Sequence, residues 1–242
     1  MRILVFQHLA VEHPGIFRDF WAESGHTWDT VALDEGAPIP DLAPFDLLVV
    51  MGGPMDVWET GLYPWLEPEI AAIHHWVAAL KRPYLGICFG HQLLAVAMGG
   101  TVGLAKAPEV GMTSVHLTPA GLTEPLLAGF PALLETFQWH GAEVQSLPPN
   151  AVVLAGNAAC AVQAMRVGTH AYGFQYHVEI TPSTVSEWGA VPAYAASLAQ
   201  ALGPDLAAGL DETVKARLPA FGKAAKLLND NLFALLAQGA QN

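Results

Sequence analysis

The sequence is poor in cysteine, and its two cysteines limit the chemistry that they can support. Cys88 and Cys160 are too few for a disulfide framework, so at most one disulfide could form. Neither cysteine lies in a CxxC motif or in a Cys/His spacing that binds metal. We therefore predict no metal centre, and no segment indicates a cofactor.

Cationic side chains are also scarce. Ten Lys and Arg stand against 22 Asp and Glu, which gives a formal net charge of −12. An acidic surface repels phosphate backbones, and the few basic residues do not cluster along the chain. Nucleic acid is therefore not an expected partner.

Long apolar runs are missing as well. Although 52% of the residues are hydrophobic, the most apolar stretches, such as residues 47–51 and 84–88, have the length of strands. They are too short to span a bilayer. Residues 2–8 do not resemble a signal peptide. We expect a soluble, cytoplasmic protein with no membrane partner.

The first hundred residues alternate between short apolar runs and amphipathic segments. Expected strands cover residues 2–7, 27–33, 46–51 and 84–88, and expected helices cover residues 14–24, 64–80 and 90–98. Continuous apolar strands separated by helices are typical of a parallel sheet that is covered on both faces. The pattern predicts an α/β fold with a mostly parallel central sheet and helices on both faces.

The pattern changes twice after residue 100. Short strands separated by turns are expected over residues 101–106, 111–118, 134–139, 151–155, 161–167 and 171–176. They predict antiparallel additions to the sheet. Helices are then expected over residues 181–202, 204–217 and 220–236, with breaks at the Gly-Pro and Leu-Pro pairs between them. These helices predict a C-terminal extension that covers the site or forms a subunit contact.

One cysteine lies at a predicted strand-to-helix junction. The segment Gly86-Ile87-Cys88-Phe89-Gly90 has the GxCxG pattern, and the same arrangement with serine is the nucleophile elbow of the α/β hydrolases. The helix N-terminus favours the thiolate form of Cys88, and the Phe89 N–H is placed to bond an oxyanion. Taken alone, the motif is equally consistent with a small buried side chain.

A histidine and a carboxylate supply the partners that such a nucleophile needs. His177 and Glu179 are two residues apart in a predicted strand, so their side chains point to the same side. A carboxylate beside an imidazole fixes its tautomer and stabilises the imidazolium. The sequence therefore predicts Cys88 as nucleophile, His177 as base and Glu179 as orienting acid of an amide hydrolase.

Three segments resemble a known family. Residues 52–54 (Gly-Gly-Pro), 86–93 and 175–179 closely resemble the signature segments of class I glutamine amidotransferases, nearest to the glutaminase domain of GMP synthase and its stand-alone relatives. The family fold is flavodoxin-like. The resemblance implies a catalytic domain over residues 1–180, with residues 181–242 as a helical extension packed on the same domain.

The resemblance also implies a reaction and further site residues. Cys88 would attack the side-chain amide of glutamine, release ammonia and leave a γ-glutamyl thioester that water hydrolyses. The N–H of Gly53 would join that of Phe89 in the oxyanion hole, and Gln92 would contact the bound glutamine. Gly141 and Ala142 would bind the amino-acid end of the substrate. The family usually has proline between its catalytic histidine and glutamate, whereas this chain has Val178.

Three functions stay open at this point. A glutaminase would pass ammonia to a separate synthetase subunit, because the chain has no ATP-binding loop of the Gly-x-x-x-x-Gly-Lys type. A free-standing γ-glutamyl peptidase would use the same thioester on a larger γ-glutamyl compound. The third alternative, a non-catalytic binding module, conflicts with the intact Cys, His and Glu set. A homo-oligomer is also possible.

Several other polar residues attract attention. His8 and His13 flank a loop after the first strand, where loops line the site in such sheets, and could make a minor contribution to specificity. Asp56 and Glu59 could meet a substrate ammonium group. His91 is expected to be structural, and Cys160 is expected to be a core residue.

Overall fold

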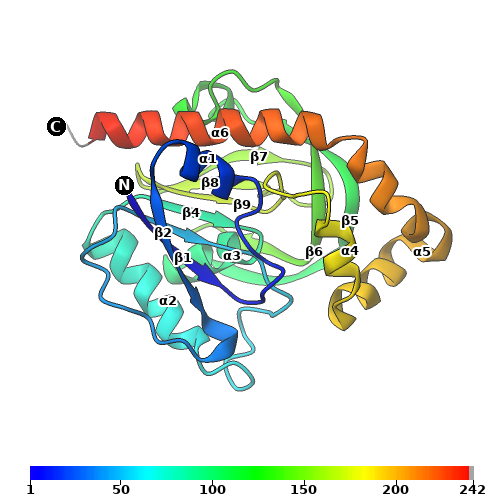
Figure 1. Cartoon of the computed structure of the whole chain (residues 1–242), viewed down its shortest axis with the longest axis horizontal. Coiled ribbons are helices and arrows are strands. Elements are labelled where there is room, and N and C mark those ends of the chain that lie inside the picture. The colour runs from blue at the N-terminus through cyan, green and yellow to red at the C-terminus, as the bar shows by residue number, and fades with distance from the viewer. Residues whose placement is uncertain (240–242) are drawn as a thin grey trace.

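The computed structural model describes residues 1–239, and within them one nine-stranded sheet runs through the molecule in the order β2-β1-β3-β4-β9-β8-β7-β5-β6. The strands are β1 (Arg2–Gln7), β2 (Thr27–Ala32), β3 (Leu47–Val50), β4 (Tyr84–Ile87), β5 (Thr101–Leu117), β6 (Leu133–Ser146), β7 (Ala151–Gly156), β8 (Ala164–Val167) and β9 (Ala171–Phe174). Figure 1 shows the long strands β5 and β6 at one end of this sheet.

The first half of the sheet is parallel, as the sequence predicts. Strands β2, β1, β3, β4 and β9 pair in parallel, so the carboxyl ends of β3, β4 and β9 lie at the same edge. Their side chains alternate between two cores: Ile3 and Val5 face one, while Leu4 and Phe6 face the other. Both faces are apolar because both are covered.

Helices cover each face of this parallel part. On one face, Trp21 of α1 (Phe17–Glu23) and Leu228 of α6 (Leu218–Gly239) pack in the same core, and Figure 1 shows the two helices together above the sheet. On the other face lie α2 (Leu66–His74), continued by a π-helical turn (His75–Ala79), and α3 (Phe89–Ala97). The expected α/β architecture is confirmed. Short 3₁₀ turns cover Leu33–Glu35, Gly121–Thr123 and Pro125–Leu127.

The second half of the sheet is antiparallel, and one prediction here is wrong. Residues 101–106 and 111–118 were expected to form two strands, but β5 is continuous over 17 residues. Its partner β6 pairs with it on both sides of the presumed turn, from Leu104 opposite Ala142 to Glu109 opposite His140. The register shift between these pairs absorbs the extra residues of β5, including Pro108, as a bulge opposite Gly141.

The C-terminal helices also depart from the prediction. A single helix was expected over residues 181–202, but α4 (Thr184–Gly189) ends early and α5 (Pro192–Lys215) starts anew with Pro192 in its first turn. Gly203, where a break was predicted, is a kink inside α5 with a φ of 71°. The last three residues of the extension over 181–242 lie outside the described residues.

The extension packs on the antiparallel part of the sheet as well as beside α1. A third core joins Phe137 and Trp139 of β6 to Trp188 of α4 and to Tyr194 and Leu210 of α5. Within the described residues, no helix is long and apolar enough to cross a membrane.

Candidate active site

Cys88 lies on a sharp turn between β4 and α3. Its backbone has a φ of 52° and a ψ of −101°, a conformation that residues with a Cβ rarely adopt. Glycines make room for this turn: a Cβ on Gly90 would lie 2.1 Å from the carbonyl oxygen of Val50. Cys88 is thereby held at the N-terminus of α3, at the carboxyl edge of the parallel strands.

The predicted base and its orienting acid lie together just beyond β9. His177 donates its backbone N–H to the carbonyl of Phe137 at 2.8 Å, which ties this segment to β6. Its ring Nδ1 donates to Glu179 Oε1 at 2.7 Å, so Nε2 is the nitrogen left for chemistry. Glu179 Oε2 accepts the N–H of Val178 at 2.9 Å. Val178 therefore supplies a backbone donor that a proline at this position would lack.

The electrostatics of His177 favour its charged form. Burial lowers the pKa of His177, but the negative charges of Glu179 and of the Cys88 thiolate raise it to well above its usual value. Both His177 and Glu179 are at most 2% exposed, so water does not weaken these interactions. A thiolate beside an imidazolium is the ion pair that a cysteine nucleophile needs.

The predicted oxyanion donors lie on either side of the sulfur. Gly53 and Phe89 line the same cavity as Cys88, because β3 and β4 are neighbours and end at the same edge. Within residues 1–239, neither backbone N–H has a hydrogen-bond partner. Two free N–H groups beside a nucleophile can stabilise negative charge on a carbonyl oxygen.

The cavity has a volume of about 200 Å³ and contains the other predicted substrate contacts, Gln92, Gly141 and Ala142. Its wall on the side of the extension comes from α5. Asp56 is the one carboxylate among the described lining residues, and burial together with Glu59 raises its pKa. Among the described residues, neither Lys nor Arg lines this cavity.

Gln92 holds the opposite wall of the cavity in place. Its Nε2 donates to the carbonyl oxygen of Ala142 at 3.0 Å and to Gln175 Oε1 at 3.1 Å. Gln175 Nε2 in turn lies 3.6 Å from the sulfur of Cys88. Because both Nε2 hydrogens of Gln92 are used within the chain, only its Oε1 remains to meet a substrate.

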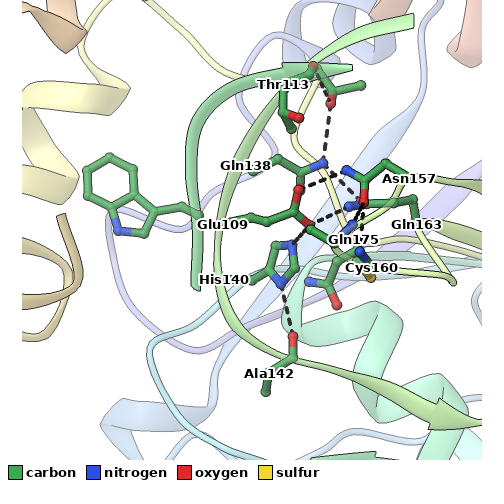
Figure 2. A network of polar contacts seen from close by, with 12 residues as sticks. Glu109, Thr113, Gln138, His140, Ala142, Asn157, Cys160, Gln163 and Gln175 are labelled. Carbon is green, nitrogen blue, oxygen red and sulfur yellow. Dashed lines mark hydrogen bonds and ion pairs between the residues drawn. The ribbon is translucent and has the colours of Figure 1, made fainter. Parts of the chain in front are cut away.

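Sequence reasoning missed a buried polar network behind this wall, which Figure 2 shows. The ring of His140 lies between the carbonyl oxygen of Ala142, at 3.0 Å from Nδ1, and Glu109 Oε2, at 3.3 Å from Nε2. Glu109 also accepts from Asn157 and Gln163, each at 2.8 Å. Burial would raise the pKa of Glu109, but these hydrogen bonds lower it. No local signal marks this network, because its members lie on three separate segments.

Neither of the two histidines expected near the site lines the cavity. His8 is instead fully buried beneath the Gly52-Gly53 turn, with Nδ1 2.8 Å from the carbonyl oxygen of Gly52. His13 is half-buried against α4, where burial lowers its pKa, and it does not line the cavity either. Cys160 is a buried core residue, as predicted, and His91, expected to be structural, is fully buried. Within residues 1–239, no cluster of three or more His, Cys, Asp or Glu side chains could hold a metal ion.

A carboxylate and a phenol near Cys88 and His177 were also missed. Tyr194 of α5 lines the cavity and donates its hydroxyl hydrogen bond to Glu12 Oε1. Glu12 is 2% exposed, and its other oxygen has no partner in the described chain. Burial raises the pKa of Glu12. The two residues are 182 positions apart, so no sequence spacing could have joined them.

Comparison with known proteins places this geometry in a family. The family model for class I glutamine amidotransferases matches residues 21–187. The glutamine amidotransferase-like protein YfeJ of Salmonella typhimurium is 35% identical over 190 residues, which are 76% of this chain and 78% of that protein. One of the subunits of the glutamine-hydrolysing GMP synthase of Saccharolobus solfataricus is 35% identical, over 59% of this chain and 72% of the relative.

Two further similarities extend the comparison. Gamma-glutamyl peptidase 3 of Arabidopsis thaliana is 31% identical over 71% of this chain and 70% of its own length. The crystal structure of a glutamine amidotransferase from Thermotoga maritima superposes with a TM-score of 0.84 at 27% identity, and 98% of each chain is covered. The chain belongs to the class I glutamine amidotransferase family.

Proposed function

We propose that the protein hydrolyses γ-glutamyl amides through a γ-glutamyl thioester on Cys88, with glutamine as the substrate. The observation that carries this proposal is the position of Cys88 on a strained turn, beside two unpaired N–H groups and in interaction with His177 of the His177–Glu179 pair. His177 acts as general acid and base, and Glu179 orients it. Gly53 and Phe89 bind the oxyanion.

The reaction proceeds in two steps. The Cys88 thiolate adds to the amide carbon, and the carbonyl oxygen takes the negative charge between the N–H groups of Gly53 and Phe89. When the C–N bond breaks, His177 gives its proton to the leaving nitrogen, and ammonia and the thioester result. Water then adds to the thioester carbon, His177 takes a water proton, and the C–S bond breaks to yield glutamate and the thiolate.

The cavity favours a substrate of amino-acid size. Its volume of about 200 Å³ is below the roughly 300–1,000 Å³ of pockets for drug-sized ligands. We propose that Asp56 attracts the α-ammonium group of the substrate, and that Gly141 and Ala142 bind its carboxylate through backbone N–H groups. Gln92 positions this segment through the carbonyl oxygen of Ala142.

A second candidate is a free-standing γ-glutamyl peptidase acting on a larger γ-glutamyl compound. The similarity to gamma-glutamyl peptidase 3 favours it, as does the position of α5, which forms a cavity wall where an ammonia acceptor would have to approach. In the first candidate, a separate synthetase subunit receives the ammonia, in line with the GMP synthase relative. For either candidate, we propose that residues 1–180 form the catalytic domain and residues 181–242 a helical extension packed on it. We also propose a cytoplasmic location and association with a second copy of the chain.

One assay separates the candidates. The purified protein is given glutamine and a panel of γ-glutamyl amides and dipeptides, and release of ammonia, amine and glutamate is followed. Turnover of glutamine without a partner supports the glutaminase, and turnover of larger compounds alone supports the peptidase. No turnover, together with an unlabelled Cys88 after treatment with a glutamine-mimicking alkylator, would contradict both.

A further inference from the structure

His8 makes two buried hydrogen bonds at the turn that carries Gly53. The residue directly follows β1 and has no exposed surface. Its Nδ1 lies 2.8 Å from the carbonyl oxygen of Gly52, and its Nε2 lies 2.8 Å from Oε1 of Glu69 on α2. Glu69 is itself fully buried.

The carbonyl oxygen of Gly52 can only accept a hydrogen bond, so Nδ1 of His8 must carry a hydrogen. An ionised Glu69 is likewise an acceptor and requires a hydrogen on Nε2 as well. The acidic groups that face it are Glu69, from α2, and Glu12, from the loop after β1. Burial lowers the pKa of His8, but these carboxylates and the Gly52 carbonyl raise it above its ordinary value.

The ring of His8 has little freedom to turn. It stacks on Trp65 with ring centroids 5.4 Å apart and meets the edge of Phe89 at 4.9 Å. Gly53 lies directly against it, because a Cβ on Gly53 would be 3.1 Å from the Cβ of His8. The imidazole is therefore a fixed donor behind the turn.

The Gly52 carbonyl and the Gly53 N–H belong to one planar, trans peptide unit, so they point in opposite directions. A donor that holds the carbonyl on the buried side necessarily directs the N–H to the other side, where Gly53 lines the cavity with Cys88. We infer that His8 is a positioning residue: through the Gly52–Gly53 peptide, it sets the direction and strength of the Gly53 oxyanion donor. A charged donor to the carbonyl also polarises the amide, which strengthens its N–H as a donor.

This inference rests on the proposed function, and matched variants test it. Asparagine at position 8 places its amide nitrogen where Nδ1 lies and keeps a donor to Gly52, whereas glutamine places its nitrogen where Nε2 lies and loses that donor. Both are compared in a Glu69→Gln background, so that no carboxylate is left buried without a partner. We expect His8→Asn/Glu69→Gln to keep kcat within about threefold of Glu69→Gln, because asparagine keeps a donor to Gly52 but not a charged one. His8→Gln/Glu69→Gln should fall a further ~10- to 100-fold.

Two readouts separate positioning from a structural role. KM should stay within about threefold across the series, because the oxyanion donor acts in the transition state. The rate at which iodoacetamide alkylates Cys88 should not change, since that reaction forms no oxyanion. Equal kcat values for the Asn and Gln variants would overturn the inference, and so would an alkylation rate that falls in parallel with kcat.

An NMR measurement without substrate tests the inference independently of turnover. In ¹⁵N NMR spectra of the unmodified protein near pH 7, we expect protons on both ring nitrogens of His8, and we expect the Gly53 amide ¹⁵N shift to move in the His8→Gln series but not in the His8→Asn series. An unprotonated Nδ1 in the unmodified protein would refute the inference even if no variant folds well. In folded variants, a Gly53 shift that does not depend on residue 8 would refute it too. Absence of γ-glutamyl turnover in the unmodified protein would instead refute the proposed function alone.

Discussion

The indole N–H of Trp139 donates a 2.8 Å hydrogen bond to the hydroxyl of Ser197, 58 residues later in the chain. This bond joins β6 to α5 across the cavity that both residues line. Tyr194, one turn earlier on α5, makes a second hydrogen bond from this helix, to Glu12 in the loop after β1. The first turns of α5 are therefore a wall of the site, and not merely an appendage to it.

Removing the Tyr194 hydroxyl tests how firmly this wall is held. Tyr194→Phe leaves Glu12 buried with neither oxygen bonded in the described chain, because Oε2 already has no partner. We expect the free energy of unfolding to fall by about 1–3 kcal/mol in urea titrations at pH 7. Adding Glu12→Gln should recover part of this loss, since a neutral amide is less costly to bury; an unchanged or larger loss would contradict this account.

Replacing Glu179 should change the pH dependence of turnover. Burial lowers the pKa of His177, and the charges of Glu179 and Cys88 raise it more, so Glu179→Gln should lower it. If activity needs the imidazolium, the alkaline limb of kcat/KM belongs to His177 and should move to lower pH by about one unit or more. Glu187→Gln, on the partly exposed side of α4, is the matched control. An unmoved alkaline limb would show that Glu179 does not act on His177.

The two cysteines should differ sharply in reactivity. Burial raises the pKa of Cys160 to about 12, and the residue is 1% exposed, so its thiolate is scarce at neutral pH. Mass spectrometry after brief treatment with iodoacetamide at about pH 7.5 should find the label on Cys88. Cys88→Ala should abolish both labelling and thioester formation, whereas Cys160→Ala should preserve both. Labelling of Cys160 at a similar rate would contradict its placement.

Glu109 should stabilise the fold in a pH-dependent way. Burial would raise its pKa, but the nearby His140 ring and the hydrogen bonds from Asn157 and Gln163 lower it below its ordinary value. The ionised form is favoured by folding, so the contribution is present above that value and is lost as the pH falls through the lowered pKa. We expect Glu109→Gln to reduce the free energy of unfolding by about 1–3 kcal/mol at pH 7 and by much less near pH 3.

The control for this prediction is a carboxylate on the surface. Glu135 is exposed and pairs with Arg217 at 3.3 Å. Glu135→Gln should change the free energy of unfolding by less than about 1 kcal/mol at either pH, because water screens exposed pairs. A loss for Glu109→Gln that is the same at both pH values would show that the charge of Glu109 is not what stabilises the network.

The sequence was sufficient for the parallel half of the fold. Continuous apolar strands and glycines around Cys88 are local signals. The structure places Cys88, His177 and Glu179 near one another. The antiparallel half was harder, because Pro108 and Gly111 are turn residues by local preference and β6 overrides that preference by pairing. The α4–α5 break was missed because the helical pattern continues across it, although Pro192 marks the new start.

The supporting residues of the site could not be predicted in the same way. Glu12, His8 and Glu109 find partners 182, 61 and 54 residues away, respectively, and each bond exists only because distant segments pack together. Periodicity detects faces of single elements, whereas these contacts depend on which elements become neighbours.

The backbone of Cys88 has a consequence for how this position is maintained. A φ of 52° suits glycine better than any residue with a side chain, so a glycine there would relieve backbone strain and remove a buried sulfur. The turn itself therefore does not require a cysteine. A homologue that kept the glycines of this turn but lost the sulfur would fold and yet lack the proposed nucleophile. Residue 88 is therefore the first position to inspect for loss of activity among relatives.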